Sequence, residues 1–200
     1  MAGHEGIAMT YVCVDVEASG QVPPLFNLLS IGAVVVRRQG SHHVLGDTFY
    51  AELRPVFPGF DPQALAVCGL DVERLRREGE PPEEALARFN AWVERENAGV
   101  RERPVFVGHN AVFDWAYLSF YYAHYGLPNP FGYKGLDTKS LAMGRLGIPW
   151  NETNKETLER MLRLPPQDPA QIHRADYDAW YQALILKGLL DPPSPALPAP

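Results

Sequence analysis

The sequence predicts one mixed α/β domain, in which helices cover a single sheet. Three strand-like segments come first, and the hydrophobic period then changes to that of helices. Between two of the expected helices lies a short apolar segment, Val105-Phe106-Val107, which is typical of a buried parallel strand. The chain has 200 residues, of which 46% are hydrophobic and 21% are charged. This composition is that of a globular domain and excludes a disordered chain.

The first three strands are expected to form an antiparallel meander, because they are close together in sequence. Turn residues separate the first two at Ser19-Gly20 and the last two at Gln39-Gly40. Aromatic and β-branched residues favour a strand in the third segment. The expected strands are residues 11–17, 28–37 and 47–53, with residues 104–108 as the later buried strand.

The expected helices follow from capping residues and apolar spacing. Asp61 with Pro62 marks one helix start, Asp71 marks a second, and glycines end both helices. The helix expected at 111–125 carries aromatic residues on all sides, so core packing is the preferred interpretation, a dimer interface the second and a base-stacking platform the third. The expected helices are residues 61–69, 71–79, 81–96, 111–125, 138–145, 155–163 and 175–190.

Composition also limits domain organisation and location. We expect one domain over residues 9–190, with residues 1–8 and 191–200 as flexible tails, since five of the 19 prolines lie in the last ten residues. Two separated cysteines, no secretory signal and no long apolar run predict a cytoplasmic protein that does not enter a membrane. The net charge of −6 argues against a protein that coats long nucleic acids.

Two acidic residues at the end of the first strand are the most informative feature. Asp15 and Glu17 are two residues apart, so their side chains leave the same face of the strand, with Cα atoms about 6.6 Å apart. Such a pair could ligate two metal ions about 3.5–4 Å apart, as in two-metal phosphoryl-transfer sites. The pair alone equally fits a strand that ends in solvent.

Two further clusters each have a functional and a structural interpretation. In the segment His109 to Asp114, Asn110 is a candidate N-cap, and Asp114 lies in the first helical turn, where acids commonly complement the helix dipole. A loop histidine bonded to the backbone is the simpler interpretation of His109. In the third cluster, His173 and Asp178 can converge if His173 lies on the loop before the helix and Asp178 lies inside it. Taken alone, that cluster could be an ordinary capped helix.

Taken together, the three clusters resemble the exonuclease motifs of the DEDDh family, the DnaQ-like group that includes proofreading subunits, ribonuclease T and oligoribonuclease. In that family the motifs read Asp-x-Glu, Asn-x-x-x-Asp and His-x-Ala-x-x-Asp, in this order. The resemblance covers residues 11–190. The matching positions in this sequence are Asp15, Glu17, Asp114, His173 and Asp178.

The resemblance implies a ribonuclease H-like fold with a mixed five-stranded sheet, whose first three strands are antiparallel and whose later strands are parallel. It also implies that the four carboxylates hold two divalent cations, Mg²⁺ or Mn²⁺, which suits oxygen ligands. His173 would act as general base on the attacking water. The product would be a nucleoside 5′-monophosphate from the 3′ end of a single strand.

Substrate-binding residues are expected beside the metal ligands. Ala18 and Ser19 correspond to the segment that holds the terminal 3′ end in this family, with Ser19 in place of a threonine. The aromatic residues next to the motifs are candidates for base stacking. The full set of expected substrate contacts is Ala18, Ser19, Phe26, His109, Asn110 and Phe113.

Two rival functions remain open at the level of sequence. One is a catalytically idle module that binds nucleic acid or associates with a polymerase, and the other is a hydrolase of very short oligonucleotides. The sequence does not distinguish DNA from RNA. Single-stranded 3′ ends are the expected partner, and a homodimer and a polymerase or repair protein stay open as further partners.

Overall fold

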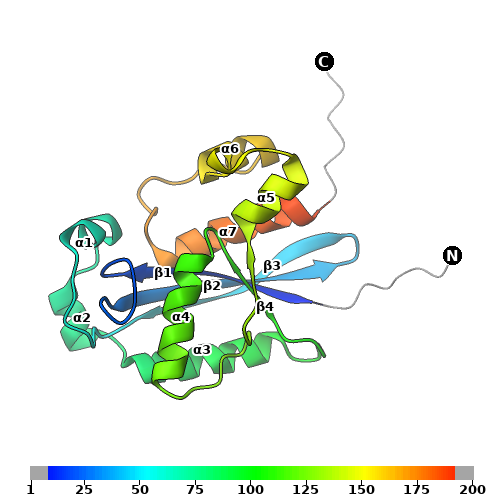
Figure 1. The fold of residues 1–200 in the computed structure, drawn as a ribbon. Coiled ribbons are helices and arrows are strands. Elements are labelled where there is room, and N and C mark those ends of the chain that lie inside the picture. Colours follow the sequence, from blue (N-terminus) through cyan, green and yellow to red (C-terminus); the bar gives the residue numbers. More distant parts are fainter. Residues whose placement is uncertain (1–8, 192–200) are drawn as a thin grey trace.

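A computed structural model describes residues 9–191 and shows one sheet between layers of helices (Figure 1). The strand order is β3-β2-β1-β4-β5, with β1, β2 and β3 antiparallel and β4 and β5 parallel to β1. This confirms the expected mixed five-stranded sheet. The strands are β1 (Thr10–Ala18), β2 (Leu28–Gln39), β3 (His42–Glu52), β4 (Val105–Gly108) and β5 (Gly135–Asp137).

The helices match the expected positions closely, because most of their ends are marked by local capping chemistry. Asp61, Asp71 and Asn154 each accept a backbone N–H in the first turn of the helix that follows. A short 3₁₀ helix, η1 (Trp150–Glu152), was not predicted. The helices are α1 (Pro62–Cys68), α2 (Val72–Glu78), α3 (Pro82–Glu96), α4 (Val112–His124), α5 (Thr138–Leu146), α6 (Lys155–Leu162) and α7 (Ala175–Leu190).

The start of α4 differs from the prediction. Asn110 is not the N-cap: its backbone has a φ of 70°, and its side chain makes no capping bond. The N-cap position belongs to Ala111, whose N–H donates to Asp137 Oδ2 over 2.8 Å. The carboxylate at the end of β5 therefore binds the backbone at the start of α4, where the sequence predicted a cap from the side chain of Asn110.

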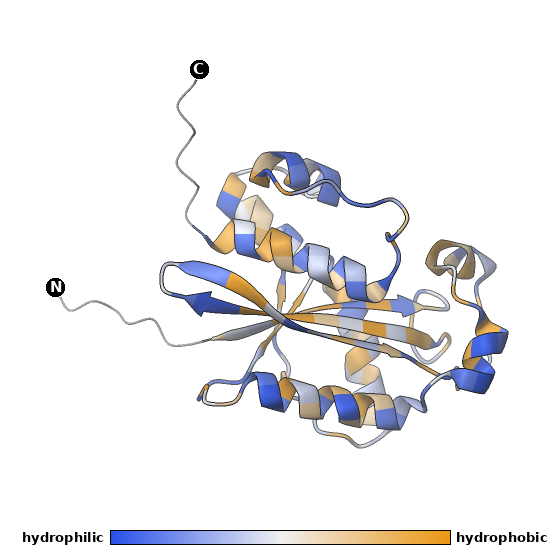
Figure 2. Ribbon diagram, turned by 180° about the vertical axis from the view of Figure 1, so that it is seen from behind, coloured by the Kyte–Doolittle hydropathy of each residue, from blue (hydrophilic) through white to orange (hydrophobic). Residues whose placement is uncertain are grey.

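The two faces of the sheet bury different helices, and alternation along β1 separates them. Val12, Val14 and Val16 belong to a core with α3 and α4, while Cys13 belongs to a second core with α7. Figure 2 shows the apolar strands between helices that carry hydrophilic outer faces. The aromatic residues of α4 lie in the first core, so core packing was the correct interpretation; the fully buried ones are Tyr117, Tyr121 and Tyr122.

The position of α7 depends on a glycine in β2. Gly32 pairs with Asp15 across the β1–β2 ladder. A Cβ atom at Gly32 would lie 2.1 Å from the backbone carbonyl of Ala175, the first residue of α7. The absence of a side chain at this position lets α7 begin directly over the strand that carries Asp15.

The predicted tails fall mainly outside the described residues, which exclude 1–8 and 192–200. Asp191 is described, and it contacts the body of the domain: its carboxylate accepts from the backbone N–H of His43 over 2.8 Å and pairs with Lys187. The packed body thus includes Asp191, one residue beyond the expected boundary. Within residues 9–191, the helices are too short or too polar to cross a bilayer.

Candidate active site

The three acidic clusters meet in one cleft beside the carboxyl end of β1. The cleft has a volume of about 620 Å³ and lies between the ends of β1 and β4, the first turns of α4 and α7, and the segment around α6. Five of its lining residues are those that the sequence motifs predicted: Asp15, Glu17, Asp114, His173 and Asp178. The long-range folding of the chain therefore brings the expected set together.

Asp15 and Glu17 leave the same face of β1, as predicted. Both are half-buried, whereas the valines that alternate with them are buried in the core of the opposite face. Gln182 of α7 donates from Nε2 to Asp15 Oδ1 over 2.5 Å. This contact fixes the Asp15 carboxylate relative to the helix that carries Asp178.

Asp114 is 4% exposed and lies in the first turn of α4. Its Oδ1 accepts from the backbone N–H of Val16, 2.9 Å away. That bond ties α4 to the strand segment between Asp15 and Glu17. The structure thereby gives Asp114 a specific partner beyond the helix dipole that the simpler interpretation invoked.

Asp178 and His173 converge as the sequence required. Asp178 is 4% exposed in the first turn of α7, and its Oδ2 accepts from the backbone N–H of His173 over 2.7 Å. His173 is exposed on the loop before α7, with a left-handed φ of 67°. One ligand atom each from Glu17, His173 and Asp178 lies within 4.8 Å of the other two.

Burial and mutual repulsion raise the free energy of the ionised carboxylates in this cluster, so binding of a positive charge is favoured. Desolvation, and then the neighbouring Asp178 and Asp114, raise the pKa of Glu17 to about 8. Burial likewise raises the pKa of Asp114 to about 7 and that of Asp15 well above its usual value. A site whose carboxylates hold protons this strongly is stabilised when cations replace the protons. The oxygen-only carboxylate set fits Mg²⁺ or Mn²⁺.

The sequence reasoning missed two residues that contact these carboxylates. The Lys155 ammonium, at the start of α6, pairs with Asp178 Oδ1 and lowers the cost of ionising the neighbouring acids. Gln182 could have been found, because it lies four residues after Asp178 and so on the same face of α7. Nothing in the local sequence around Lys155 indicates that the start of α6 packs against α7 and reaches Asp178.

The expected substrate contacts divide into two groups. His109, Asn110 and Phe113 line the cleft. The Nδ1 atom of His109 lies 2.8 Å from Thr138 Oγ1, and burial, followed by the charges of Lys155 and Lys139, lowers the pKa of His109 to about 4. His109 is therefore neutral at physiological pH.

The other expected contacts are not among the residues that line the cleft. Ser19 is fully buried, and its hydroxyl donates to Gly59 O over 2.8 Å. Its side chain is a structural link between loops, so the expected contact of that hydroxyl with a strand end is corrected. Ala18 is also buried, and Phe26 packs beside Gly20 and the core rather than into the cleft.

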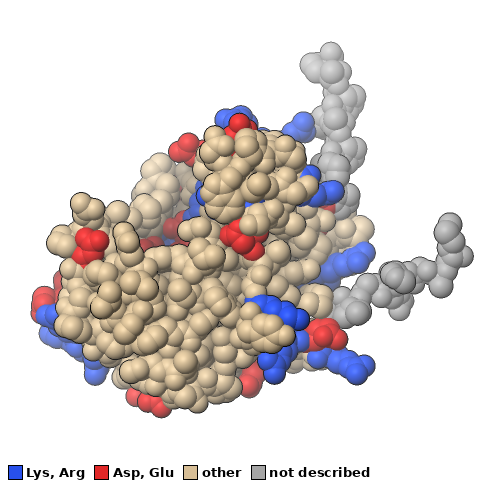
Figure 3. Space-filling model, viewed as in Figure 1, with Lys and Arg blue, Asp and Glu red and all other residues tan. Residues whose placement is uncertain are grey.

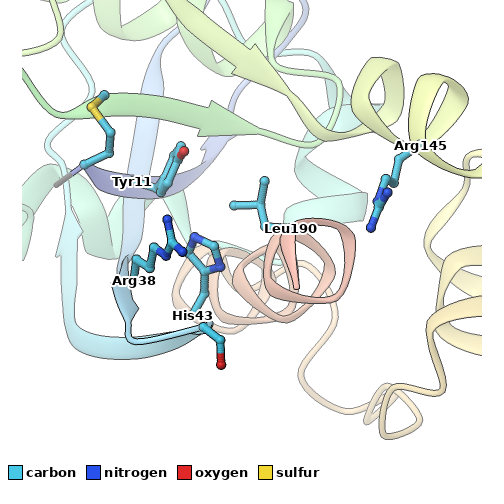
Figure 4. A pocket seen from close by; sticks show the side chains of 7 residues that line it. Tyr11, Arg38, His43, Arg145 and Leu190 are labelled. Carbon is cyan, nitrogen blue, oxygen red and sulfur yellow. The ribbon is translucent and has the colours of Figure 1, made fainter. Parts of the chain in front are cut away.

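A second cavity, of about 470 Å³, lies at the other end of β1 (Figure 4). It is lined by Met9, Tyr11, Arg38, Ser41, His43, Arg145 and Leu190, with no carboxylate among these described residues. It therefore lacks the donor set of the first cleft. On the face drawn in Figure 3, the Lys and Arg side chains form separate groups rather than a continuous basic track.

Comparisons with known proteins agree with the geometry. The family model RNase_T, described as "Exonuclease", matches residues 12–186. The chain is 35% identical over 179 residues to the Escherichia coli protein named 3′-5′ DNA exonuclease Cap18, covering 88% of this chain and 89% of that protein. It is 29% identical over 189 residues to ribonuclease T of Marinobacter nauticus, covering 90% and 81%.

The fold has counterparts among solved structures. The nuclease domain of 3′hExo, described as a DEDDh family member bound to rAMP, superposes with a TM-score of 0.71. The two chains are 14% identical, and the match covers 94% of each. At this identity the likeness establishes the fold alone.

Proposed function

Since this chain belongs to the RNase T family of 3′–5′ exonucleases, we propose that it releases nucleoside 5′-monophosphates from the 3′ ends of single-stranded DNA by metal-assisted hydrolysis. The observation that carries the proposal is the convergence in one cleft of four carboxylates and a histidine from β1, α4 and the start of α7. This set makes a catalytically idle binding module the weaker candidate.

Asp15, Glu17, Asp114 and Asp178 would hold the cations. Two divalent cations at such a site supply charge stabilisation for the scissile phosphate and for the attacking and leaving oxygens. Gln182 and the backbone N–H of Val16 hold Asp15 and Asp114 in place. Fixed ligand positions are what such catalysis requires of the protein.

His173 would take the proton from the attacking water. Its ring sits on an exposed loop, and its backbone N–H is anchored to Asp178, so the imidazole stays beside the carboxylates without being buried among them. The water oxygen bonds to the terminal phosphorus, and the bond from phosphorus to the 3′ oxygen of the preceding nucleotide breaks. That oxygen leaves with a proton, and the released nucleotide keeps its 5′ phosphate.

The preference for single-stranded DNA rests on two further observations. The more similar of the two relatives is named as a DNA exonuclease. The net charge of −6 and the separated basic groups of Figure 3 suit the capture of one strand end better than wrapping of a long duplex. Bound cations would offset the acidity of the cleft itself.

The test is a panel of 5′-labelled single- and double-stranded DNA and RNA of one sequence. We expect stepwise shortening of single-stranded DNA with Mg²⁺ or Mn²⁺, loss of activity with excess chelator, and recovery when the metal is restored. A 3′-phosphate should slow release sharply. Asp15→Ala should lose at least about 10²-fold in rate, because its metal ligand is gone.

Three results would overturn parts of the proposal. Full activity in excess chelator would exclude the metal site. Cleavage of a closed circular single strand at a comparable rate would identify an endonuclease. Faster degradation of single-stranded RNA than of DNA would keep the exonuclease chemistry and reassign the substrate.

A further inference from the structure

An exposed tryptophan lies next to a lysine that lines the cleft. Lys139, in the first turn of α5, lines the cleft, and its Nζ lies 4.7 Å from the centre of the Trp150 ring. The Trp150 side chain is 46% exposed and does not itself line the cleft. Its indole is thus reached from the carboxylates by passing Lys139.

The local backbone holds Trp150 firmly. Thr153 is fully buried, and both its backbone N–H and its hydroxyl donate to Trp150 O, over 3.2 Å and 2.7 Å. Asn154 then caps α6 by accepting from Thr157 N–H over 2.8 Å. The segment from Trp150 to Lys155 is therefore one fixed turn that connects the indole to the cleft.

Charge beside this tryptophan suits a nucleic-acid backbone. Lys139 forms no ion pair with any carboxylate of residues 9–191, in contrast to Lys155, which pairs with Asp178. A lysine beside an exposed indole combines a cation for phosphate with an aromatic face for a base, the two elements that proteins use to hold single strands.

We propose that Lys139 and Trp150 form a subsite for a nucleotide at least two positions upstream of the scissile one, in which Trp150 stacks on an unpaired base and Lys139 contacts the backbone phosphate. This inference rests on the proposed exonuclease function and deepens it, because it predicts a preference for strands over dinucleotides. A dinucleotide has only one nucleotide on each side of the scissile bond, so it would leave this subsite empty.

The experiment compares a 12-nucleotide single strand with a dinucleotide. Trp150→Ala should raise KM for the 12-mer roughly 10-fold, the lower part of the range for loss of one base stack, with kcat unchanged and with the dinucleotide unaffected. Trp150→Phe should recover most of the lost affinity. Binding of a labelled 12-mer to the Asp15→Asn protein should weaken by the same factor when Trp150→Ala is added.

Tyr133 offers a matched control. It is 83% exposed, Lys134 lies over its ring at 5.5 Å, and it precedes β5 at the end opposite to the cleft. Tyr133→Ala should leave both substrates unchanged. Equal losses on the 12-mer and the dinucleotide, or no loss on either, would overturn the subsite. An absence of nucleotide release by the unaltered protein on every substrate would instead overturn the proposed function.

Discussion

At the scale of single residues, the structure separates the roles of two of the basic residues that line the cleft, His173 and Lys155. His173 is exposed on a loop with a free ring, whereas the Lys155 ammonium pairs directly with Asp178. A group that accepts a proton must be able to approach water, while a group that neutralises carboxylates must touch them. His173 fits the first description and Lys155 fits the second.

His173→Ala should lower kcat by about 10²–10⁴-fold, the usual contribution of a positioned general base. Binding of Mn²⁺, measured by calorimetry, should change little, because four carboxylates remain. The competing interpretation is real, since His173, Glu17 and Asp178 place ligand atoms within 4.8 Å of one another. A collapse of Mn²⁺ affinity together with kcat would make the imidazole a metal ligand.

Lys155→Met should tighten Mn²⁺ binding by roughly 10-fold, because the ammonium and the metal compete for the same carboxylate. The same change should lower the melting temperature of the metal-free protein above pH 8. There the acids are ionised, and the variant lacks the ammonium that balances their charge. Lys139→Met is the control, as Lys139 lines the same cleft but contacts Trp150 rather than a carboxylate. Weaker metal binding in Lys155→Met would mean that the lysine organises the site.

At the scale of elements, the sequence predicted an element correctly where residues close in sequence define its ends. It failed where the element depends on residues distant in sequence. The ends of α1 were predictable because Asp61, Pro62 and Gly69 act within one turn. No range was predicted for the fifth strand, β5, since its three residues become a strand only by pairing with β4. The N-cap of α4 was assigned wrongly for a similar reason, because the backbone N–H at the start of α4 is bound by Asp137 of β5, a residue distant in sequence.

The candidate site divides in the same way. The resemblance to the exonuclease motifs named its five main residues, and the structure brings all five to one cleft, while their catalytic roles stay a prediction. The partners Gln182 and Lys155, and the burial of Ser19, depend on how distant segments pack, which no local pattern in a single sequence records. The orientation of functional side chains is therefore the part that needed the structure.

Gly32→Ala should separate the two halves of the site. The added Cβ would meet the Ala175 backbone at 2.1 Å, so the first turn of α7 must move away from β1, and Asp178 with it. We expect a loss of at least about 10²-fold in activity, because misplacement by about 1 Å can cost that much. Mn²⁺ affinity should fall in parallel. Gly144→Ala is the control, since nothing lies within 4 Å of a Cβ there.

At the scale of the whole molecule, repulsion among the carboxylates of the cleft opposes folding of the domain. Four carboxylates gather in a chain whose net charge is already −6, and three of them have raised pKa values. A carboxyl whose pKa is higher in the folded state than in the unfolded chain binds more protons when folded. Folding stability then decreases as pH rises from the unfolded pKa to the folded one.

The metal-free protein should therefore lose stability between about pH 4 and pH 8, the window set by ordinary carboxyl pKa values and by those of Asp114, about 7, and Glu17, about 8. Below about pH 5, protonation of Glu96 and Asp191, whose pKa values are lowered by hydrogen bonds that outweigh their burial, would add an opposite trend. The informative comparison is thus between pH 6 and pH 8.5.

In excess chelator, we expect the melting temperature to fall by at least about 5 °C from pH 6 to pH 8.5, the size of a change of a few kcal/mol in a domain of this length. Saturating Mg²⁺ should remove most of the fall, because the cation replaces the protons that the carboxyls have lost. The double variant Glu17→Gln, Asp114→Asn isolates the cause, since its pH dependence should be much flatter in chelator and it should gain little from Mg²⁺. An equally steep fall in that variant would place the destabilising groups elsewhere in the molecule.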